Sequence, residues 1–444
     1  MNGETSHQSM TEPRRRDPDP LLYPLLGVFA LTFLSGLFLA VYFIPTFTQA
    51  FPSVERLNEQ VPFGWFIRRI HGTGATFSLI LIIVSLLRVL YTGDYKVNPR
   101  SSWAIGVLLL LMGIVTNLTG FLLPLSQSAL WGTVTALSGL SSIPWVGDFL
   151  VYLLRGGKEL GGSALIRFYG VHIGIAVLMA FLLYRTYQKL SERKISRNLF
   201  AFIALLGLIL AAITFLPDWF SDPLQEAANP MVNPERVIPP WYFFFFEEAL
   251  KFLTGAYPFW SGAAFLLSLI LLFALPFIDR GPQLRLLFRP IILGLGAASL
   301  VLFLYFSLLG IANAHYGQKV ILPAGPLAPE VVRGAQVFAQ KNCAYCHQVF
   351  GREGRREGPD IFRIKQRERS PDWIRRYVLN SRLYQPGTTM PRYEIPLEDL
   401  EALSAYLLAF DSKQGGFEAA DRKELLDFGL YLYPRVKGQG EKRQ

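Results

Sequence analysis

Residues 63–90, FGWFIRRIHGTGATFSLILIIVSLLRVL, combine a histidine with an apolar run long enough to cross a lipid bilayer. No charged residue lies between His71 and Arg88. About 20 mostly apolar residues span the hydrocarbon core of a membrane as an α-helix. An imidazole within such a helix is costly to place in lipid, which makes it a candidate functional group. This stretch therefore predicts a membrane helix that carries a site of chemistry.

The composition of the whole chain also indicates a membrane protein. Of its 444 residues, 51% are hydrophobic, 14% are aromatic and 17% are charged, and the mean hydropathy is +0.31. A soluble domain averages about 25% charged residues, so this chain is too poor in charge to be soluble and too apolar to be disordered. The distribution of its net charge of +10 points to a membrane surface, and we expect no nucleic-acid partner.

Charge-free runs divide the first part of the chain into seven predicted membrane crossings, each close to the length that spans a bilayer. Their approximate cores are 22–44, 63–90, 103–124, 168–187, 198–217, 259–278 and 289–311. Two further apolar segments, 128–155 and 238–254, contain Gly, Pro and Trp and are predicted to lie at the membrane interface. The predicted fold class is all-α, a seven-helix transmembrane bundle followed by a small all-α domain.

Lysine and arginine are distributed unevenly between the two ends of these helices. If the amino terminus is cytoplasmic, the segments on its side hold 14 basic residues and the segments on the other side hold 5. Basic flanks favour the cytoplasm, so we expect the domain after the seventh crossing to be periplasmic, in a protein of the bacterial cytoplasmic membrane. We expect no signal peptide, because Arg14–Arg16 precede a spanning stretch without a small-residue cleavage site.

After residue 319 the composition becomes that of a small soluble domain. Pro323, Pro326 and Pro329 predict a stiff linker before it. The apolar patch 425–433 in the basic tail predicts a surface helix with a frayed end, and docking to a partner is the alternative. The predicted parts are a cytoplasmic tail 1–20, a four-helix domain 21–190, a three-helix domain 191–318, a linker 319–327, a soluble domain 328–412 and a tail 413–444.

The strongest short motif is Cys343-Ala-Tyr-Cys346-His347. This C-x-x-C-H spacing lets two thiols bond the vinyl groups of one haem while the adjacent imidazole binds the iron. A redox dithiol is the alternative, but the adjacent histidine and the absence of a βαβ pattern disfavour it. Met390 lies in a polar Gly/Pro turn and is the candidate sixth iron ligand, although a lone methionine is more often a packing residue.

This region resembles the small class I cytochromes c over residues 328–412. The resemblance implies one covalent haem c, a contact between the first and last helices, a carbonyl that orients the proximal histidine and a loop that carries the sixth ligand. The residues that match these features are Gly334, Phe338 and Tyr406 for the helix contact, Gly358 and Pro359 for the carbonyl segment, and Met390 and Pro391 for the loop.

Two histidines predict a second haem, inside the membrane. His71 and His172 each lie less than half-way into their predicted helices from the outer end, at similar depth. Two imidazoles on helices of the same direction can clamp one haem iron from both faces, and hydrogen-bonded core histidines are the alternative. His315, at the outer end of the last helix, is more simply an interfacial hydrogen-bonding residue.

Other residues near these histidines fit a haem pocket. Gly36 and Gly120 lie near the outer ends of the first and third helices, where a missing side chain leaves space for a porphyrin plane. Glycines that simply tighten helix contacts are the alternative. Arg68, one turn before His71, is placed to meet a haem propionate.

A second resemblance covers most of residues 20–312, to cytochrome b of the quinol:cytochrome c reductases, with the chloroplast type most similar. It implies that His71 and His172 bind the outer-side haem b of this family, and that the chain fuses the amino- and carboxy-terminal halves of cytochrome b. The matching segments are 63–75, Gly120–Pro124, Ile143–Gly147 and Arg167–His172 in the first half, and Asn229–Pro234 with Pro239–Phe243 in the second.

Two family features are missing from this chain. The family has a second histidine pair about 14 residues further along each helix, or ~21 Å deeper at 1.5 Å per residue. Here those positions are Ser85 and Thr186 or Tyr187, which predicts one haem b and no inner haem. The family motif Pro-Glu-Trp-Tyr at the quinol site also lacks its carboxylate, because Pro240 replaces the glutamate.

Residues 229–248, the quinol-site segment, retain other candidate residues. Proton removal from a quinol needs a group of suitable geometry and pKa, and Glu247 and Glu248 are the nearest carboxylates along the segment. The alternative is that both face solvent at the membrane surface. The candidate quinol-site residues are Pro239, Trp241, Tyr242, Glu247 and Glu248.

These features predict a membrane electron-transfer subunit of a cytochrome bc-type complex. Electrons would pass between a quinol and a c-type cytochrome acceptor through one haem b and one haem c, without crossing the bilayer. By resemblance, a Rieske-type iron–sulfur protein or another periplasmic redox protein is an expected partner, and the chain is expected to form a homodimer. The alternative is a non-enzymatic haem relay or membrane anchor whose quinone site is inert.

Overall fold

The computed structural model describes most of the chain between Leu21 and Asp421. Three predicted features fall mainly outside the described residues: the crossing at 198–217, the interfacial segment 238–254 and the tail patch 425–433. The described residues are 21–96, 100–141, 143–156, 162–188, 204–209, 211–212, 224, 226–229, 245, 248, 258–281, 289–313, 319–323, 326–349, 358–361, 363–385, 388, 390–410 and 417–421.

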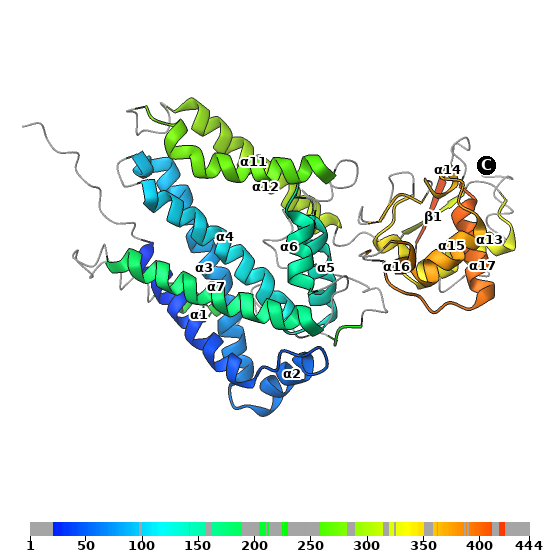
Figure 1. The fold of residues 1–444 in the computed structure, drawn as a ribbon, viewed down its shortest axis with the longest axis horizontal. Helices are drawn as coiled ribbons and strands as arrows, with labels where there is room; N and C mark the ends of the chain where they lie inside the picture. Colours follow the sequence, from blue (N-terminus) through cyan, green and yellow to red (C-terminus); the bar gives the residue numbers. More distant parts are fainter. Residues whose placement is uncertain are drawn as a thin grey trace, which may run out of the picture.

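Four long apolar helices form the centre of the larger part of the molecule (Figure 1). Their packed pairs are α1 with α3, α3 with α4, and α4 with α7. Their facing side chains are apolar, with Val28 and Leu183 among the most buried, as expected for helices whose apolar surface continues from core to lipid. The four helices are α1 (Leu22–Tyr42), α3 (Gly64–Thr92), α4 (Arg100–Leu122) and α7 (Gly162–Gln188).

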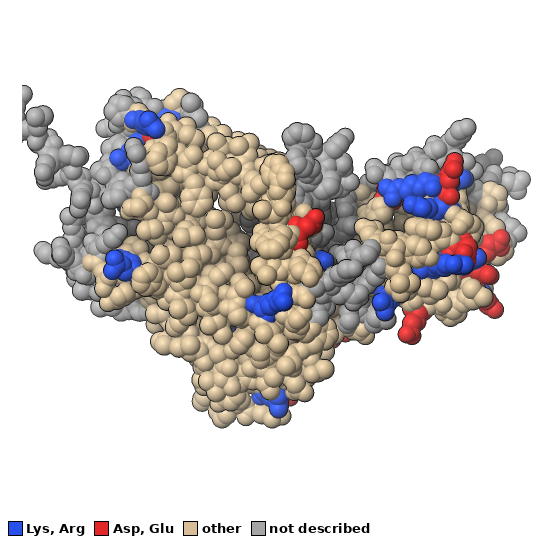
Figure 2. Space-filling view, in the orientation of Figure 1, with Lys and Arg blue, Asp and Glu red and all other residues tan. Residues whose placement is uncertain are grey.

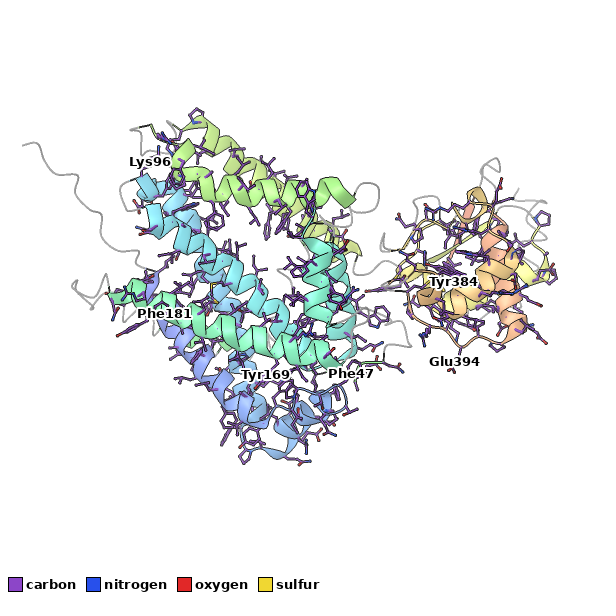
Figure 3. The ribbon with its side chains drawn as sticks, in the orientation of Figure 1. Phe47, Lys96, Tyr169, Phe181, Tyr384 and Glu394 are labelled. Carbon is purple, nitrogen blue, oxygen red and sulfur yellow. The ribbon has the colours of Figure 1, made fainter. Side chains whose placement is uncertain are left out.

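Three shorter helices lie at one end of this bundle: α2 (Ala50–Gln60), α5 (Gln127–Ser141) and α6 (Gly147–Arg155). We call this end the α5 end and the opposite one the Lys96 end; Figure 3 labels Phe47 at the first and Lys96 at the second. The segment 128–155, predicted to lie at the interface, forms α5 and α6. Helix α2 was not predicted, since its eleven residues are mostly polar.

In the second half the structure gives the bounds of two helices, α11 (Pro258–Ile278) and α12 (Pro290–Asn313). Helix α11 packs on α4, where the indole nitrogen of Trp103 donates a hydrogen bond of 2.8 Å to the carbonyl of Leu272. By length and composition, five of the described helices can cross a membrane: α1, α3, α4, α7 and α12. Charged side chains are sparse over the helical bundle and gather on the C-terminal domain (Figure 2).

The C-terminal domain is built around the crossing of its first and last long helices, α13 (Pro329–Gln340) and α17 (Leu397–Leu408). A Cβ atom on Gly334 would lie 2.0 Å from the carbonyl oxygen of Ala402, so only glycine allows this approach. The rings of Phe338 and Tyr406 pack 5.2 Å apart beside it. Shorter helices complete the domain: η3 (Cys343–Tyr345), α14 (Arg363–Gln366), α15 (Pro371–Leu379) and α16 (Ser381–Tyr384).

The structure differs from the sequence prediction at both edges of this domain. Residues predicted as linker and tail form two antiparallel strands, β1 (Lys319–Pro323) and β2 (Phe417–Asp421). Ile321 on β1 is buried in the domain core, and its carbonyl accepts a hydrogen bond of 2.7 Å from the hydroxyl of Tyr406. Two short strands therefore accompany the helices of this mostly helical domain.

Candidate functional site

His71 on α3 and His172 on α7 face each other inside the four-helix bundle. Their ring centroids are 6.1 Å apart and their planes are inclined by 67°. A metal ion held at ~2.0–2.1 Å by each imidazole nitrogen, with ~1 Å from that nitrogen to its ring centre, places two opposed rings ~6 Å apart. The spacing of the two rings therefore fits one iron between them.

Each histidine is oriented by a main-chain carbonyl of the neighbouring helix. The Nδ1 atom of His71 donates to the carbonyl of Thr32 on α1 at 2.9 Å, and that of His172 donates to the carbonyl of Thr116 on α4, also at 2.9 Å. A carbonyl oxygen only accepts hydrogen bonds, so Nδ1 carries the proton in both rings. This leaves the Nε2 lone pair of each imidazole for a metal, the arrangement expected of metal-binding histidines.

Gly36 and Gly120 lie directly against these two rings. A Cβ atom on Gly36 would be 2.8 Å from Cε1 of His71, and one on Gly120 would be 2.8 Å from Cε1 of His172. Both distances are too short for a methyl group without movement of the ring. The two glycines thus make room for the imidazoles, and the space for a porphyrin plane beside them stays a prediction.

The two histidine pockets repeat the same short sequence. Thr32-Phe-Leu-Ser-Gly36 on α1 and Thr116-Asn-Leu-Thr-Gly120 on α4 share the pattern T-x-x-[S/T]-G. In each copy the first residue supplies the carbonyl acceptor, the fourth places its hydroxyl 3.3–3.4 Å from the histidine Nδ1, and the glycine contacts the ring. This repeat becomes legible in the sequence only once the two histidines are taken as iron ligands.

The bundle toward the Lys96 end contains no comparable pocket among its described residues. The Oγ atom of Ser85, at the position of the family's second ligand on α3, is buried without a hydrogen-bond partner in this part of the chain. Thr186 donates to the carbonyl of Leu182 on its own helix. Gly106 on α4 faces a side chain here and not an open space, because a Cβ atom on it would lie 2.9 Å from the side chain of Leu86. Ile82 and Leu183, one turn before Ser85 and Thr186 on their helices, are buried together.

The C-x-x-C-H motif is held at the end of α13 by main-chain hydrogen bonds, including one from the amide of His347 to the carbonyl of Cys343 at 3.0 Å. Cys343 and Cys346 are not disulfide-bonded. The Nδ1 atom of His347 donates to the carbonyl of Pro359 at 2.8 Å, as expected for the segment Gly358-Pro359. A Cβ atom on Gly358 would be 2.5 Å from the His347 ring, so glycine is required there.

The protonation states of His347 and Cys343 suit an iron ligand and a thiol that is to bond haem. Burial lowers the pKa of His347, although its hydrogen bond to Pro359 acts in the opposite direction, and the neutral imidazole that results is the form that binds metals. Burial also raises the pKa of the Cys343 thiol to about 12. Met390 packs against the domain core, and its carbonyl accepts a hydrogen bond from Ser381 at 3.1 Å. Its role as the sixth ligand stays a prediction.

Only part of the quinol-site segment lies among the described residues. Its first residue, Asn229, is fixed to α5: its amide donates to Oε1 of Gln127 at 2.6 Å, and its carbonyl accepts from Nε2 of the same side chain at 3.2 Å. Glu248 is buried, with 4% of its surface exposed, so the solvent-facing alternative does not hold for it. Pro239, Trp241, Tyr242 and Glu247, and also His315, lie outside the described residues.

Arg68 lies on α3, one turn before His71, and is half-buried. Its proposed contact with a propionate stays a prediction. No group of three or more His, Cys, Asp or Glu side chains that could hold a metal occurs among the described residues. The metal-binding capacity found in this part of the chain therefore consists of the paired imidazoles and the C-x-x-C-H motif, both of which suit iron within a porphyrin.

Comparisons with known proteins agree with this geometry. Residues 23–192 match the family described as cytochrome b/b6/petB, and residues 227–326 match the family described as cytochrome b(C-terminal)/b6/petD. The cytochrome b of Acanthamoeba castellanii is 34% identical over 278 residues, which cover 57% of this chain and 71% of that relative. The chain belongs to the cytochrome b family.

This cytochrome b also carries a second family domain, because residues 331–411 match the family described as cytochrome c. A solved structure titled "Hyperthermophilic respiratory Complex III" aligns with a TM-score of 0.58 over 67% of this chain and 85% of the other, at 24% identity, which is a likeness of fold. The fused b-type and c-type domains make the chain a multi-pass membrane redox subunit of the cytochrome bc type, with residues for haem b and haem c.

Proposed function

We propose that this cytochrome b transfers electrons between a quinol and a c-type acceptor on the periplasmic side of the bacterial cytoplasmic membrane. One haem b would be held by His71 and His172, and one haem c would be attached to Cys343 and Cys346, with His347 and Met390 as iron ligands. When bound, these haems supply reversible one-electron transfer. Oxidation of one quinol to a quinone releases two electrons, which leave one at a time, and two protons.

The single observation that carries this proposal is the repeated histidine pocket. The Thr32 and Thr116 carbonyls keep Nδ1 of both imidazoles protonated, and the glycines at 36 and 120 admit both rings. An inert membrane scaffold has no reason to hold two imidazoles with their Nε2 atoms available. This observation supports the quinol oxidoreductase role. The loss of the family's quinol-site glutamate, taken alone, would favour the haem relay or membrane anchor.

The proposal includes a single haem b per chain. This is supported by the burial of Ile82 and Leu183, one turn from Ser85 and Thr186, and by the fact that neither Ser85 nor Thr186 is a haem ligand. Electrons would therefore remain on one side of the membrane, and a Q cycle with an inner haem would not operate. We include Glu248 as the proton acceptor because it is a buried carboxylate within the quinol-site segment.

The partners in this proposal are a quinone, a c-type cytochrome acceptor, a Rieske-type iron–sulfur protein or another periplasmic redox protein, and a second copy of the chain. The basic residues that flank the predicted crossings support the orientation, with the amino terminus in the cytoplasm.

The test is the haem content of the purified chain, measured by pyridine haemochrome spectra. We expect one haem b and one haem c per chain. His71→Ala should remove the b band and leave the c band, and addition of quinol to the native protein should reduce the b band. Two b haems per chain, or a b band of full height in His71→Ala, would contradict the ligand assignment. Reduction of the c band alone, by an added donor and not by quinol, would favour the relay.

A further inference from the structure

The C-terminal domain touches the membrane bundle through its C-x-x-C-H motif. Tyr345, between the two cysteines, packs against Trp131 on α5, and these two side chains are 4% and 8% exposed. Cys346 and Val134 pack around the same contact. Figure 1 shows α5 on the side of the bundle that faces the C-terminal domain. Burial of two large aromatic side chains from different domains indicates a specific docked position.

The face of α5 that makes this contact also binds Asn229, the first residue of the quinol-site segment. Gln127, which binds Asn229 through both polar atoms of its amide, lies four residues before Trp131 and seven before Val134. Residues at this spacing share one face of a helix, here over ~10 Å of its length. Another side of α5 is fixed to the bundle, because a Cβ atom on Gly132 would be 2.8 Å from the Phe121 ring of α4.

The position of Cys346 gives this contact a chemical meaning. In a C-x-x-C-H motif each cysteine sulfur bonds the periphery of the porphyrin, so atoms that touch Cys346 lie at the macrocycle edge. That edge is where electrons enter or leave a covalently attached haem with least protein in between. Trp131 and Val134 thus lie where an electron-transfer contact needs close packing.

From these contacts, the geometry points to α5 as a docking surface on which Trp131 and Tyr345 hold the haem c attachment site, on the same face of the helix that binds Asn229, the first residue of the quinol-site segment. Trp131 and Tyr345 are positioning residues: they set where the haem c attachment site lies against α5 and are not proposed to touch substrate. The inference rests on the proposed function for its electron-transfer consequence. The docked position itself does not depend on which quinone is used or on whether quinol is a substrate.

The first test measures docking without any turnover of substrate. A photo-crosslinking residue, p-benzoylphenylalanine, replaces Val134 in the full-length haem-loaded chain, and mass spectrometry after irradiation locates the crosslink. We expect a crosslink to the peptide that contains Tyr345, and its loss in the Tyr345→Ala background. If the crosslink does not form in the chain that keeps Tyr345, the docked position is overturned. The same probe at Trp145, which is 89% exposed, is the matched control and should give no crosslink to this peptide.

The second test measures the rate of electron transfer to haem c in Trp131→Ala. Trp131→Phe is the conservative variant and Trp145→Ala is the control. If truncation lowers the docked fraction to about a tenth, the rate at which quinol reduces haem c falls about tenfold in proportion. Haem b reduction, the c-band spectrum and the c-haem potential should be unchanged, and Phe should restore most of the rate. An unchanged rate of c-haem reduction in Trp131→Ala would overturn the positioning role.

The two tests separate this inference from the proposed function. If quinol reduces neither haem in the native chain while the Val134 crosslink forms, the quinol oxidoreductase role fails and the docked position stands. If quinol reduces both haems while no crosslink reaches Tyr345, the docked position fails and the quinol oxidoreductase role stands.

Discussion

Gly36 and Gly120 are the residues whose substitution tests the histidine pockets most directly. An alanine at either position places a methyl carbon 2.8 Å from an imidazole ring, which must then move away from its carbonyl acceptor. Loss of such a supporting hydrogen bond typically weakens metal binding about 10–100-fold. We therefore expect Gly36→Ala and Gly120→Ala each to lower the haem b content of purified protein, measured by the b-to-c ratio in haemochrome spectra.

Gly174 provides the matched control on the same helix as His172. A Cβ atom there meets nothing within 4 Å, so Gly174→Ala should keep its haem b. If the b-to-c ratio is equal in the Gly36, Gly120 and Gly174 variants, the contact between glycine and imidazole has no part in haem binding.

At Glu248 the prediction concerns proton removal. Its buried carboxylate is the proposed acceptor, and general bases contribute about 10²–10⁴-fold to rates. We expect Glu248→Gln to slow quinol oxidation by at least about 100-fold in stopped-flow assays, while haem content and spectra stay native. Glu226→Gln, an exposed carboxylate near the same segment, should keep the native rate. Equal rates in the two variants would remove Glu248 from the mechanism.

The sequence was sufficient to identify the iron-ligand candidates and insufficient to show what holds them. His71 and His172 stand out because an imidazole in an apolar helix is rare. Their acceptors are main-chain carbonyls of Thr32 and Thr116, and a carbonyl has no signature in the sequence. Only the spacing of threonine and glycine on two other helices reveals that pocket, and it is informative only when the packing of those helices is known.

At the level of secondary structure, hydropathy predicted the long helices well because each must satisfy its own backbone within lipid. The predicted cores 22–44 and 63–90 correspond to α1 and α3 within two residues at each end. The strand pair β1 and β2 was missed because its partners are nearly 100 residues apart. Neither strand alternates polar and apolar residues, so no local pattern marks the pairing.

Strand β2 is predicted to stabilise the C-terminal domain. Its removal leaves β1 unpaired and exposes part of Val320, Ile321 and Leu322, which are 1–3% exposed in the structure. Exposing the equivalent of one aliphatic side chain lowers the free energy of unfolding by about 1.5–3 kcal/mol. Truncation after residue 412 should therefore lower the melting temperature of the domain, followed by the c-band absorbance. Truncation after Asp421 keeps the strand and is the control. Identical melting curves for the two truncations would show that β2 does not support the domain.

On the scale of the whole molecule, the two halves of the cytochrome b are joined at the Lys96 end by a buried polar cluster. Asp279, after α11, accepts hydrogen bonds from Lys96 at 2.6 Å, from Arg289 at 2.9 Å and from the hydroxyl of Tyr95. Arg289 also donates to the carbonyl of Leu90 at 2.9 Å, and its side chain is 2% exposed. These bonds connect the loop after α3 with the α11–α12 connection, opposite the end that carries the histidines.

This cluster predicts how the stability of the whole bundle depends on pH. Burial opposes ionisation of Asp279, but its bonds to Lys96 and Tyr95 and the charge of Arg289 outweigh that effect and lower its pKa below the ordinary 3.8. Burial and the bond to Asp279 raise the pKa of Tyr95 above its ordinary 10.0. The stabilisation by Asp279 is therefore complete above pH 3.8 and is lost as pH falls below it, whereas that by Tyr95 is complete below pH 10.0 and is lost at higher pH.

Asp279→Asn tests this connection, because it removes the charge that compensates a buried arginine. Removing one partner of a buried ion pair costs about 3–5 kcal/mol, so the variant should melt at lower temperature in detergent at pH 7, with a weaker loss of stability on acidification than the native chain. Haem b content should stay native, since the histidine pockets lie toward the other end. Asp148→Asn, at an exposed carboxylate of α6, is the control. Equal melting temperatures for the two variants would mean that apolar packing of α11 on α4, and not the charged cluster, holds the two halves together.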